Sequence, residues 1–158
     1  MKQNVSPIPK GYHTATPYMV VRDAARALEF YKKAFGAKEL FRMPSPDGKI
    51  MHAEFVIGDS HIMLAEENPG MCAKSPETLG GTPVSLFLYV ENADGFFKTA
   101  TSAGAKSIME PQDMFWGDRF GKLSDPFGHE WSVATHIEDV TSEEMGKRMK
   151  AQFAKASA

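Results

Sequence analysis

The chain has 158 residues, of which 42% are hydrophobic and 24% charged, a composition typical of one ordinary globular domain. Its formal net charge of -2 excludes the basic footprint expected of a protein that binds nucleic acid or an anionic membrane surface. The single cysteine, Cys72, excludes an internal disulfide bond and a cysteine-based zinc site, and we expect it to be a free thiol in a loop.

No membrane-spanning or secretory segment is expected. The longest apolar runs fall short of the ~18 residues that a membrane span needs. The N-terminus also lacks the apolar core of a signal peptide. We therefore expect a cytoplasmic protein without a membrane partner.

The first half of the chain predicts a strand, a helix and three further strands. Asp23 is a candidate N-cap, and Gly36 is expected to end the helix that follows it. Turn signals at 44–48 and 58–60 separate the later strands. The predicted strands of this half cover 14–21, 38–43, 51–57 and 61–65.

The second half repeats the same order of elements. Residues 66–82 are polar and rich in Gly and Pro, which predicts a loop that links the two halves. Asn92 is expected to cap a second helix that ends at Gly104. The turn over 125–128 lies between two alternating runs and predicts a hairpin. The strands of this half are predicted over 83–90, from 105–108 onward, and in the hairpin over 115–136.

An internal repeat supports this division. Residues 18–23 resemble 87–92 at an offset of 69 (87 − 18), and residues 35–38 resemble 103–106 at an offset of 68 (103 − 35). The predicted fold is therefore α+β, with two repeated βαβββ modules that form a curved mixed sheet or partial barrel around a cavity, plus a C-terminal helix. The expected divisions are an N-terminal arm over 1–10, a single domain over 11–140 (module one 12–66, linker 67–82, module two 83–136), and a C-terminal helix and tail over 141–158.

The C-terminal segment has its own helical signature. Thr141 and Glu144 have the spacing of a capping box, and Met145, Met149 and Phe153 recur every four residues. This apolar stripe is expected to pack on the domain or on a dimer partner. A ligand groove is the alternative.

Alternation along the strands divides their side chains into two sets. The set expected to pack on the helices comprises Pro17, Met19, Val21, Leu86, Leu88, Val90, Trp131 and Val133. The set expected to face the cavity includes Thr16, Tyr18, Val20, Ser85, Phe87, Tyr89, Glu130 and Ser132.

Two further groups are candidates for chemistry. His52 and Glu54 lie two residues apart on one strand face, so they form either an acid–base pair in the pocket or an ordinary polar pair; a metal site there would need Glu130 or Tyr18 as well. Trp116, Arg119 and Phe120 suggest a stacking wall with a donor for a carboxylate or phosphate. The alternative is that the aromatic rings cover the core and that Arg119 pairs with Asp118 or Asp125. The remaining histidines, His13, His61, His129 and His136, lie near strand or turn ends, where solvated or capped histidines are common.

The sequence resembles the glyoxalase, bleomycin-resistance and extradiol-dioxygenase superfamily, whose fold is called vicinal oxygen chelate. The residues that carry the resemblance are 17–23, 30–31, 35–37, 116–121 and 125–131, and the likeness runs from about Gly11 to Thr141. Within the superfamily the sequence is most similar to the PhnB-like branch. The resemblance implies a homodimer.

The resemblance also implies where a metal would bind. The metal enzymes of this superfamily take His, Glu or Gln ligands from the first and last strand of each module. These positions correspond to Thr16, Met63, Ser85 and Ser132, none of which is such a ligand. Hydroxyl and thioether groups are weak ligands for zinc, nickel or iron. We therefore predict no metal and no other cofactor.

Three functions remain open at this point. The first is metal-independent binding of a small organic or anionic molecule, of which antibiotic sequestration is one version. The second is a lyase, isomerase or dioxygenase that uses a divalent metal held by His52, Glu54 and Glu130. The third is a non-catalytic dimeric interaction protein that uses the C-terminal helix. The pocket residues expected under the first are Tyr18, His52, Glu54, Phe87, Tyr89, Trp116, Arg119, Phe120 and Glu130.

Overall fold

A computed structural model gives the fold and describes residues 5–71 and 73–156. Cys72, expected to be a free thiol, lies outside the described residues. Module one contains β1 (Tyr18–Val21), α1 (Ala24–Phe35), β2 (Lys38–Pro44), β3 (Ile50–Ile57) and β4 (Ser60–Glu66). Module two contains β5 (Ser85–Tyr89), α3 (Ala93–Ser102), β6 (Lys106–Asp113), β7 (Asp118–Ser124) and β8 (Glu130–His136).

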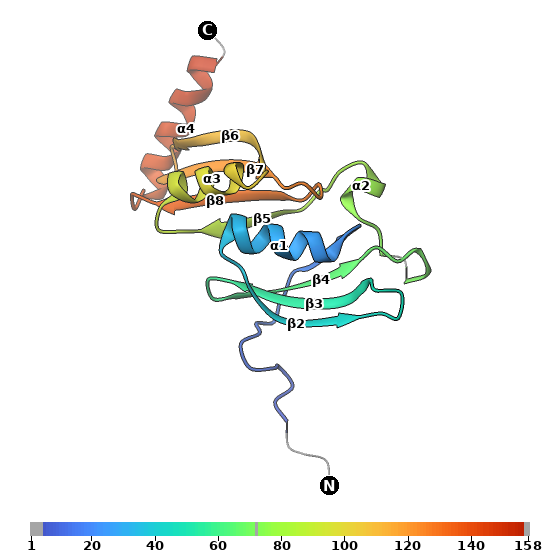
Figure 1. The fold of residues 1–158 in the computed structure, drawn as a ribbon. Helices are drawn as coiled ribbons and strands as arrows, with labels where there is room; N and C mark the ends of the chain where they lie inside the picture. The colour runs from blue at the N-terminus through green and yellow to red at the C-terminus, as the bar shows by residue number, and fades with distance from the viewer. Residues whose placement is uncertain (1–4, 72, 157–158) are drawn as a thin grey trace.

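The two modules form two separate four-stranded sheets (Figure 1). Sheet A has the order β1-β4-β3-β2 and sheet C the order β5-β8-β7-β6, each with one parallel pair, β1 with β4 and β5 with β8. Tyr18 pairs with Met63 in the same way that Phe87 pairs with Ser132. The predicted α+β fold of two repeated modules is therefore confirmed, and the sheets do not close into a barrel.

The predicted helix caps are present. Asp23 accepts a hydrogen bond from the backbone N–H of Arg26, and Asn92 accepts one from that of Gly95, as N-caps do. Gly36 ends α1 with a φ of 65°, a left-handed conformation that glycine adopts without steric cost.

The linker differs from the predicted loop. It contains a short 3₁₀ helix, η1 (Pro69–Met71), and the four-residue helix α2 (Pro76–Leu79). Ser75 caps α2 and Pro76 starts it, which is the usual place for proline in a helix. A single turn of helix has no apolar repeat, so periodicity could not reveal it.

Two strand boundaries also differ from the prediction. Residues 14–17 belong to the N-terminal arm rather than to β1, so the first strand is shorter than expected. Strand β6 continues through Pro111 to Asp113. Proline is tolerated there because β6 is the edge strand of sheet C and its outer side needs no hydrogen-bond donor.

The two helices share one core with both sheets. Helices α1 and α3 pack together, and in Figure 1 α1 lies between the strands of the two modules. The Phe35 ring is 5.5 Å from Phe96 of α3 and 4.6 Å from Trp131 of β8, measured between ring centroids. Of the side chains expected to face the helices, Met19, Val21, Trp131 and Val133 are buried, and Leu86, Leu88 and Val90 are partly buried against the core. The opposite face of each sheet carries exposed side chains, such as Tyr18 on sheet A and Phe87 on sheet C, and we call it the uncovered face.

The C-terminal helix α4 (Ser142–Ala156) extends away from module two (Figure 1). Thr141 caps it by accepting a hydrogen bond from the N–H of Glu144. Arg148 pairs with Glu138 and Glu144, which fixes the start of the helix to the segment before it. No helix of the described chain is long and apolar enough to cross a membrane.

A buried carboxylate joins the two modules. Asp125, in the turn between β7 and β8, is 4% exposed and accepts hydrogen bonds from the hydroxyl of Tyr31 at 2.8 Å and the indole N–H of Trp131 at 2.9 Å. The backbone N–H groups of Phe127 and His129 donate to its other oxygen. Burial, and then the charge of Asp125, raise the pKa of Tyr31 well above its usual value, so the phenol remains a donor.

We expect Asp125→Ala to lower the free energy of unfolding by about 3 kcal/mol or more. At least two enclosed donors would lose their acceptor, at about 1–3 kcal/mol each. Denaturant unfolding would measure the loss. The control is Asp59→Ala at an exposed turn, which should change stability by less than about 0.5 kcal/mol. A loss at Asp125 no larger than at Asp59 would contradict the assignment.

Candidate functional site

The uncovered faces of the sheets carry the candidate site residues. Tyr18, Met63 and Glu54 are register partners across sheet A, so their side chains lie on the same face. Phe87 and Ser132 hold the equivalent positions on sheet C. Tyr18 is 53% exposed and Phe87 is 47% exposed, in contrast to the buried residues on the helix side.

On sheet A, three of the predicted residues form a hydrogen-bonded chain. The hydroxyl of Tyr18 is 3.1 Å from Nδ1 of His52, and Nε2 of His52 is 3.1 Å from a carboxylate oxygen of Glu54. The expectation that His52 and Glu54 share a face is met. Tyr18 joins them and Glu130 does not.

The N-terminal arm lies over the Glu54 end of these hydrogen-bonded residues. The sequence did not predict this contact. The rings of Tyr12 and His61 are 4.5 Å apart, and a Cβ on Gly11 would lie 2.5 Å from the His61 ring. The Tyr12 hydroxyl and Nδ1 of His61 are enclosed, and neither has a hydrogen bond of standard geometry. The arm lies outside the internal repeat, so the repeat could not predict this contact. The only sequence features that pointed to it were the aromatic ring of Tyr12 and the glycine before it.

Charge and burial set the protonation states around Glu54. Burial, and then the adjacent Glu54 carboxylate, raise the pKa of Tyr12 to about 12. The pKa of Glu54 is lowered, first by the Tyr12 hydroxyl beside it and then by His52. Glu54 is therefore an anion at neutral pH, and Tyr12 keeps its proton.

A cavity of about 790 Å³ opens on the same sheet beside Tyr18 and His52, and we call it the sheet-A pocket. This volume is within the range of about 300–1,000 Å³ typical of small-molecule sites. Its wall combines strands β1, β3 and β4 with the ends of β2 and the loop that follows β4. The lining residues are Tyr18, Met43, Ser45, Asp47, Lys49, Ile50, Met51, His52, Ala65, Glu66, Glu67, Asn68, Pro69, Met71 and Ala73.

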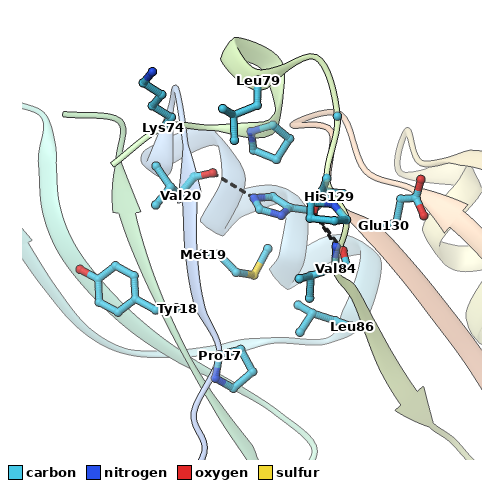
Figure 2. A pocket seen from close by; sticks show the side chains of 14 residues that line it. Pro17, Tyr18, Met19, Val20, Lys74, Leu79, Val84, Leu86, His129 and Glu130 are labelled. Atoms are coloured by element: carbon cyan, nitrogen blue, oxygen red, sulfur yellow. Dashed lines mark hydrogen bonds between the residues drawn. The ribbon is translucent and has the colours of Figure 1, made fainter. Parts of the chain in front are cut away.

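A smaller cavity of about 260 Å³ lies where the two modules meet (Figure 2). Strands β1 and β5 and the α2 segment line it, mostly with apolar side chains such as Met19, Leu79 and Leu86. The imidazole Nε2–H of His129 donates to the carbonyl oxygen of Val20 at 2.9 Å, as the dashed line in Figure 2 shows. His129 therefore ties module two to the edge strand of module one.

Sheet C carries an aromatic cluster on its uncovered face. Phe87 lies 4.9 Å from Tyr89 and 5.6 Å from Phe120, and Trp116 lies 5.8 Å from Phe120. Trp116 and Phe120, predicted to form a stacking wall, therefore lie together with Phe87 and Tyr89 on this face, and their role in binding a ligand stays a prediction. Among the described residues, no hydrogen bond or ring contact links this aromatic cluster to Tyr18, His52 or Glu54. A single protein molecule therefore does not bring all the predicted site residues into contact.

A second buried carboxylate, which the sequence did not single out, organises this cluster. Asp118 is 4% exposed and accepts hydrogen bonds from Tyr89 at 3.2 Å, from the indole N–H of Trp116 at 3.0 Å and from Nδ1 of His136 at 2.8 Å. Nε2 of His136 donates to Asp139. The carboxylates of Asp139 and Asp118, in that order, raise the pKa of His136.

Two predicted site residues have structural partners instead. Arg119 does not face the aromatic cluster: its guanidinium bonds to Asp94 of α3 and to Asp113 of β6. Its neighbour in register is Thr135, whose hydroxyl accepts a hydrogen bond from the backbone N–H of Ala93 in α3, so Arg119 lies on the helix side of β7. Glu130 pairs with Lys122 at 2.6 Å on sheet C, away from His52 and Glu54.

Comparison with known proteins now decides the family. A family model described as Glyoxalase/Bleomycin resistance protein/Dioxygenase superfamily matches residues 12–133, which cover module one and most of module two. The chain belongs to this superfamily. The resemblance predicted from the sequence is confirmed at this level, whereas membership of the PhnB-like branch remains a prediction.

The chain is similar to known proteins at several levels of sequence identity. An uncharacterized protein of Mycobacterium tuberculosis is 44% identical over 140 residues, covering 87% of this chain and 82% of its own length. The solved structure of TioX from Micromonospora sp. ML1 is 26% identical with a TM-score of 0.63, covering 78% of this chain and 99% of that chain. FosX of Listeria monocytogenes, a fosfomycin resistance protein solved with Mn(II) and sulfate, is 17% identical with a TM-score of 0.60 over 87% of this chain and 97% of that chain. That last likeness supports the fold alone.

The metal positions of the superfamily do not fit an ion here. The hydroxyl groups of Ser85 and Ser132 lie 3.1 Å apart and bond to each other, and Thr16 donates to the backbone of His13. Met63 supplies only a thioether. Within residues 5–71 and 73–156, no group of three or more His, Cys, Asp or Glu side chains could hold a metal. The four positions therefore lack the nitrogen and carboxylate ligands that zinc, nickel or manganese prefer.

We expect purified protein, dialysed after incubation with zinc, nickel, iron or manganese, to retain far less than one ion per chain. Elemental analysis by mass spectrometry would measure the ratio. One tightly bound ion per chain that Ser85→Ala and Ser132→Ala remove would contradict this expectation.

We also expect His136 to stabilise the fold in a pH-dependent way. Its pKa is raised above 6.5 in the folded state, so this stabilisation is complete below about pH 6.5 and is lost as the pH rises through the folded-state pKa. The difference in melting temperature between the unmodified protein and His136→Gln should shrink between about pH 6 and pH 9. Scanning fluorimetry would follow it, with His13→Gln in the exposed arm as the control. A difference that grows with pH would contradict the role.

Proposed function

We propose that this protein binds a small, neutral or positively charged organic molecule in the sheet-A pocket, without the usual metal ion of its superfamily. The observation that carries the proposal is the pocket of about 790 Å³ that Tyr18 and His52 line. Methionine and isoleucine side chains supply its apolar wall. Convergent polar groups in a cavity of this size are the usual features of a ligand site.

The charges in the pocket argue against an anionic ligand. Asp47, Glu66 and Glu67 line it, against the single ammonium group of Lys49. Hydrogen bonds from Ser75 and Thr78 lower the pKa of Glu67 to about 2, so this carboxylate stays ionised. The guanidinium of Arg119, expected from the sequence to bind an anion, is engaged on the other side of sheet C. A ligand with a net negative charge would therefore be repelled.

A second chain would give the pocket its missing wall. Large apolar side chains are exposed on the uncovered parts of both sheets: Tyr18, Phe41, Met43 and Met51 on sheet A, and Phe87 and Tyr89 on sheet C. Exposed apolar patches of this kind mark interaction surfaces. A homodimer that covers these faces would complete the site from two copies, which is the partner expected from the family resemblance.

We expect matched compounds to separate the ligand classes in a thermal-shift screen. Each set has one aromatic skeleton with an amidine, an amide or a carboxylate group. A ligand present at 100 times its dissociation constant adds about 2.7 kcal/mol, or about 5–10 °C in melting temperature for a chain of this size. Amidines or amides should stabilise the protein, and their carboxylates should not.

Variants then locate the bound compound. Tyr18→Phe and Met51→Lys should weaken the stabilisation, whereas Arg119→Ala should leave it unchanged, since Arg119 lies away from the pocket. The proposal fails if only carboxylates stabilise the protein, if no set does, or if Arg119→Ala alone removes the effect.

We expect the protein to be a dimer in light scattering, and Phe87→Glu to shift it towards monomer, since a buried unpaired carboxylate would oppose association. Met149→Glu on α4 is the matched control and should leave the dimer intact. Dissociation by Met149→Glu alone would instead assign the contact to the C-terminal helix.

A further inference from the structure

The hydrogen-bonded chain on sheet A has a defined direction. Glu54 is a carboxylate and can only accept, so Nε2 of His52 carries the hydrogen in that bond. In the neutral imidazole this leaves Nδ1 as an acceptor, and the Tyr18 hydroxyl is the donor to it. The order is therefore phenol, imidazole, carboxylate, with both bonds at 3.1 Å.

We propose that Tyr18, His52 and Glu54 form a proton relay, and that the Tyr18 oxygen is the acid–base group of the sheet-A pocket. This proposal rests on the proposed function, since the relay acts on the molecule that the pocket binds. In the forward step the phenolic proton moves to Nδ1 of His52, and the Tyr18 oxygen removes a proton from the bound molecule. In the reverse step each proton returns. The Glu54 carboxylate stabilises the imidazolium that exists between the two steps.

The arrangement follows the physical logic of other relays that activate a hydroxyl group. A weak acid gains reactivity when an adjacent base can take its proton and a third group orients that base. Here His52 is the base, and Glu54 fixes its tautomer and orientation. Reversible proton transfer needs no oxidant, reductant or metal. The substrate class is a neutral or cationic organic molecule with an acidic proton on oxygen or on a carbon next to a carbonyl group.

Tyr89 provides an internal comparison. It is 66% exposed, more than Tyr18, but its hydroxyl donates to the Asp118 carboxylate. Burial and that carboxylate raise the pKa of Tyr89. A hydrogen bond to a carboxylate stabilises the protonated form of the phenol. A hydrogen bond to a neutral imidazole instead places a base next to the phenolic proton that can accept it. If the relay operates, Tyr18 is the more reactive phenol in spite of its lower exposure.

The test measures that reactivity without knowledge of the natural ligand. The full chain is treated with phenylmethylsulfonyl fluoride, and labelling of each tyrosine is followed by peptide mass spectrometry. In the reaction the phenol oxygen forms a bond to sulfur, the sulfur–fluorine bond breaks, and the phenolic proton leaves through His52. Tyr18 should react at least about tenfold faster than Tyr89 and than free N-acetyltyrosine amide, as expected for assistance by a general base.

Variants decide whether the relay causes the reactivity. His52→Gln keeps a polar side chain that cannot take the proton, and Glu54→Gln removes the charge that stabilises the imidazolium. Each should lower the Tyr18 labelling rate about tenfold or more, whereas His13→Gln should not change it. Near-ultraviolet circular dichroism checks that each variant is folded. If a variant does not fold, the comparison of Tyr18 with Tyr89 in the unmodified protein still decides.

The proposal is overturned if Tyr18 reacts no faster than N-acetyltyrosine amide, or if folded His52→Gln retains the full rate. These failures are separate from failure of the binding function. If amidines or amides stabilise the protein but Tyr18 is labelled slowly, the proposed binding site stands and the proposed relay is wrong. Fast labelling without stabilisation by any compound would keep a reactive tyrosine and remove the proposed ligand class.

Discussion

The carboxylate of Asp125 is the constraint on which the arrangement of the two modules depends. It lies in the turn of the last hairpin and receives hydrogen bonds from the hydroxyl of Tyr31 on α1 and from the indole of Trp131 on β8. Two backbone N–H groups of its own turn complete its partners. A buried charge is tolerated only when donors surround it. Module one must therefore place Tyr31 against module two, and this closes the core around α1 and α3.

Closing the core on the helix side has a consequence for function. Each sheet buries one face against the helix pair and leaves its other face uncovered, and the two uncovered faces have diverged in chemistry. The strand register places Tyr18 and Met63 of sheet A at positions equivalent to Phe87 and Ser132 of sheet C. The backbone duplication is retained, but sheet A presents a hydrogen-bonded phenol–imidazole–carboxylate chain, whereas sheet C presents stacked rings around Asp118. Hydroxyl and thioether groups occupy the four positions that correspond to the metal ligands of the superfamily's metal enzymes.

Local sequence signals predicted the elements well because they act over a few residues. Asp23, Asn92 and Gly36 mark helix ends through their own side chains or backbone freedom, and the repeat fixed the order of the strands. The signals failed where the deciding partner is distant in the chain. Arg119 lies beside two aromatic residues in sequence, yet the alternation of β7 turns it to the helix side, where Asp94 and Asp113 bind it. Helix α2 is too short to show a helical repeat of apolar residues, and the contact of Tyr12 with His61 lies outside the internal repeat. Neither could therefore be predicted from sequence periodicity.

The sequence by itself determined the superfamily, the duplicated α+β fold, the shared face of His52 and Glu54, and the absence of the usual ligands at four positions. These follow from residue type and spacing, which folding does not alter. Only the tertiary structure decided that Tyr18 is hydrogen-bonded to His52, that Glu130 pairs with Lys122 instead, and that the aromatic cluster lies on a different sheet from Tyr18, His52 and Glu54. Such pairings depend on which strands become neighbours and on how far each side chain reaches across them, and neither quantity is contained in the order of residues along one strand.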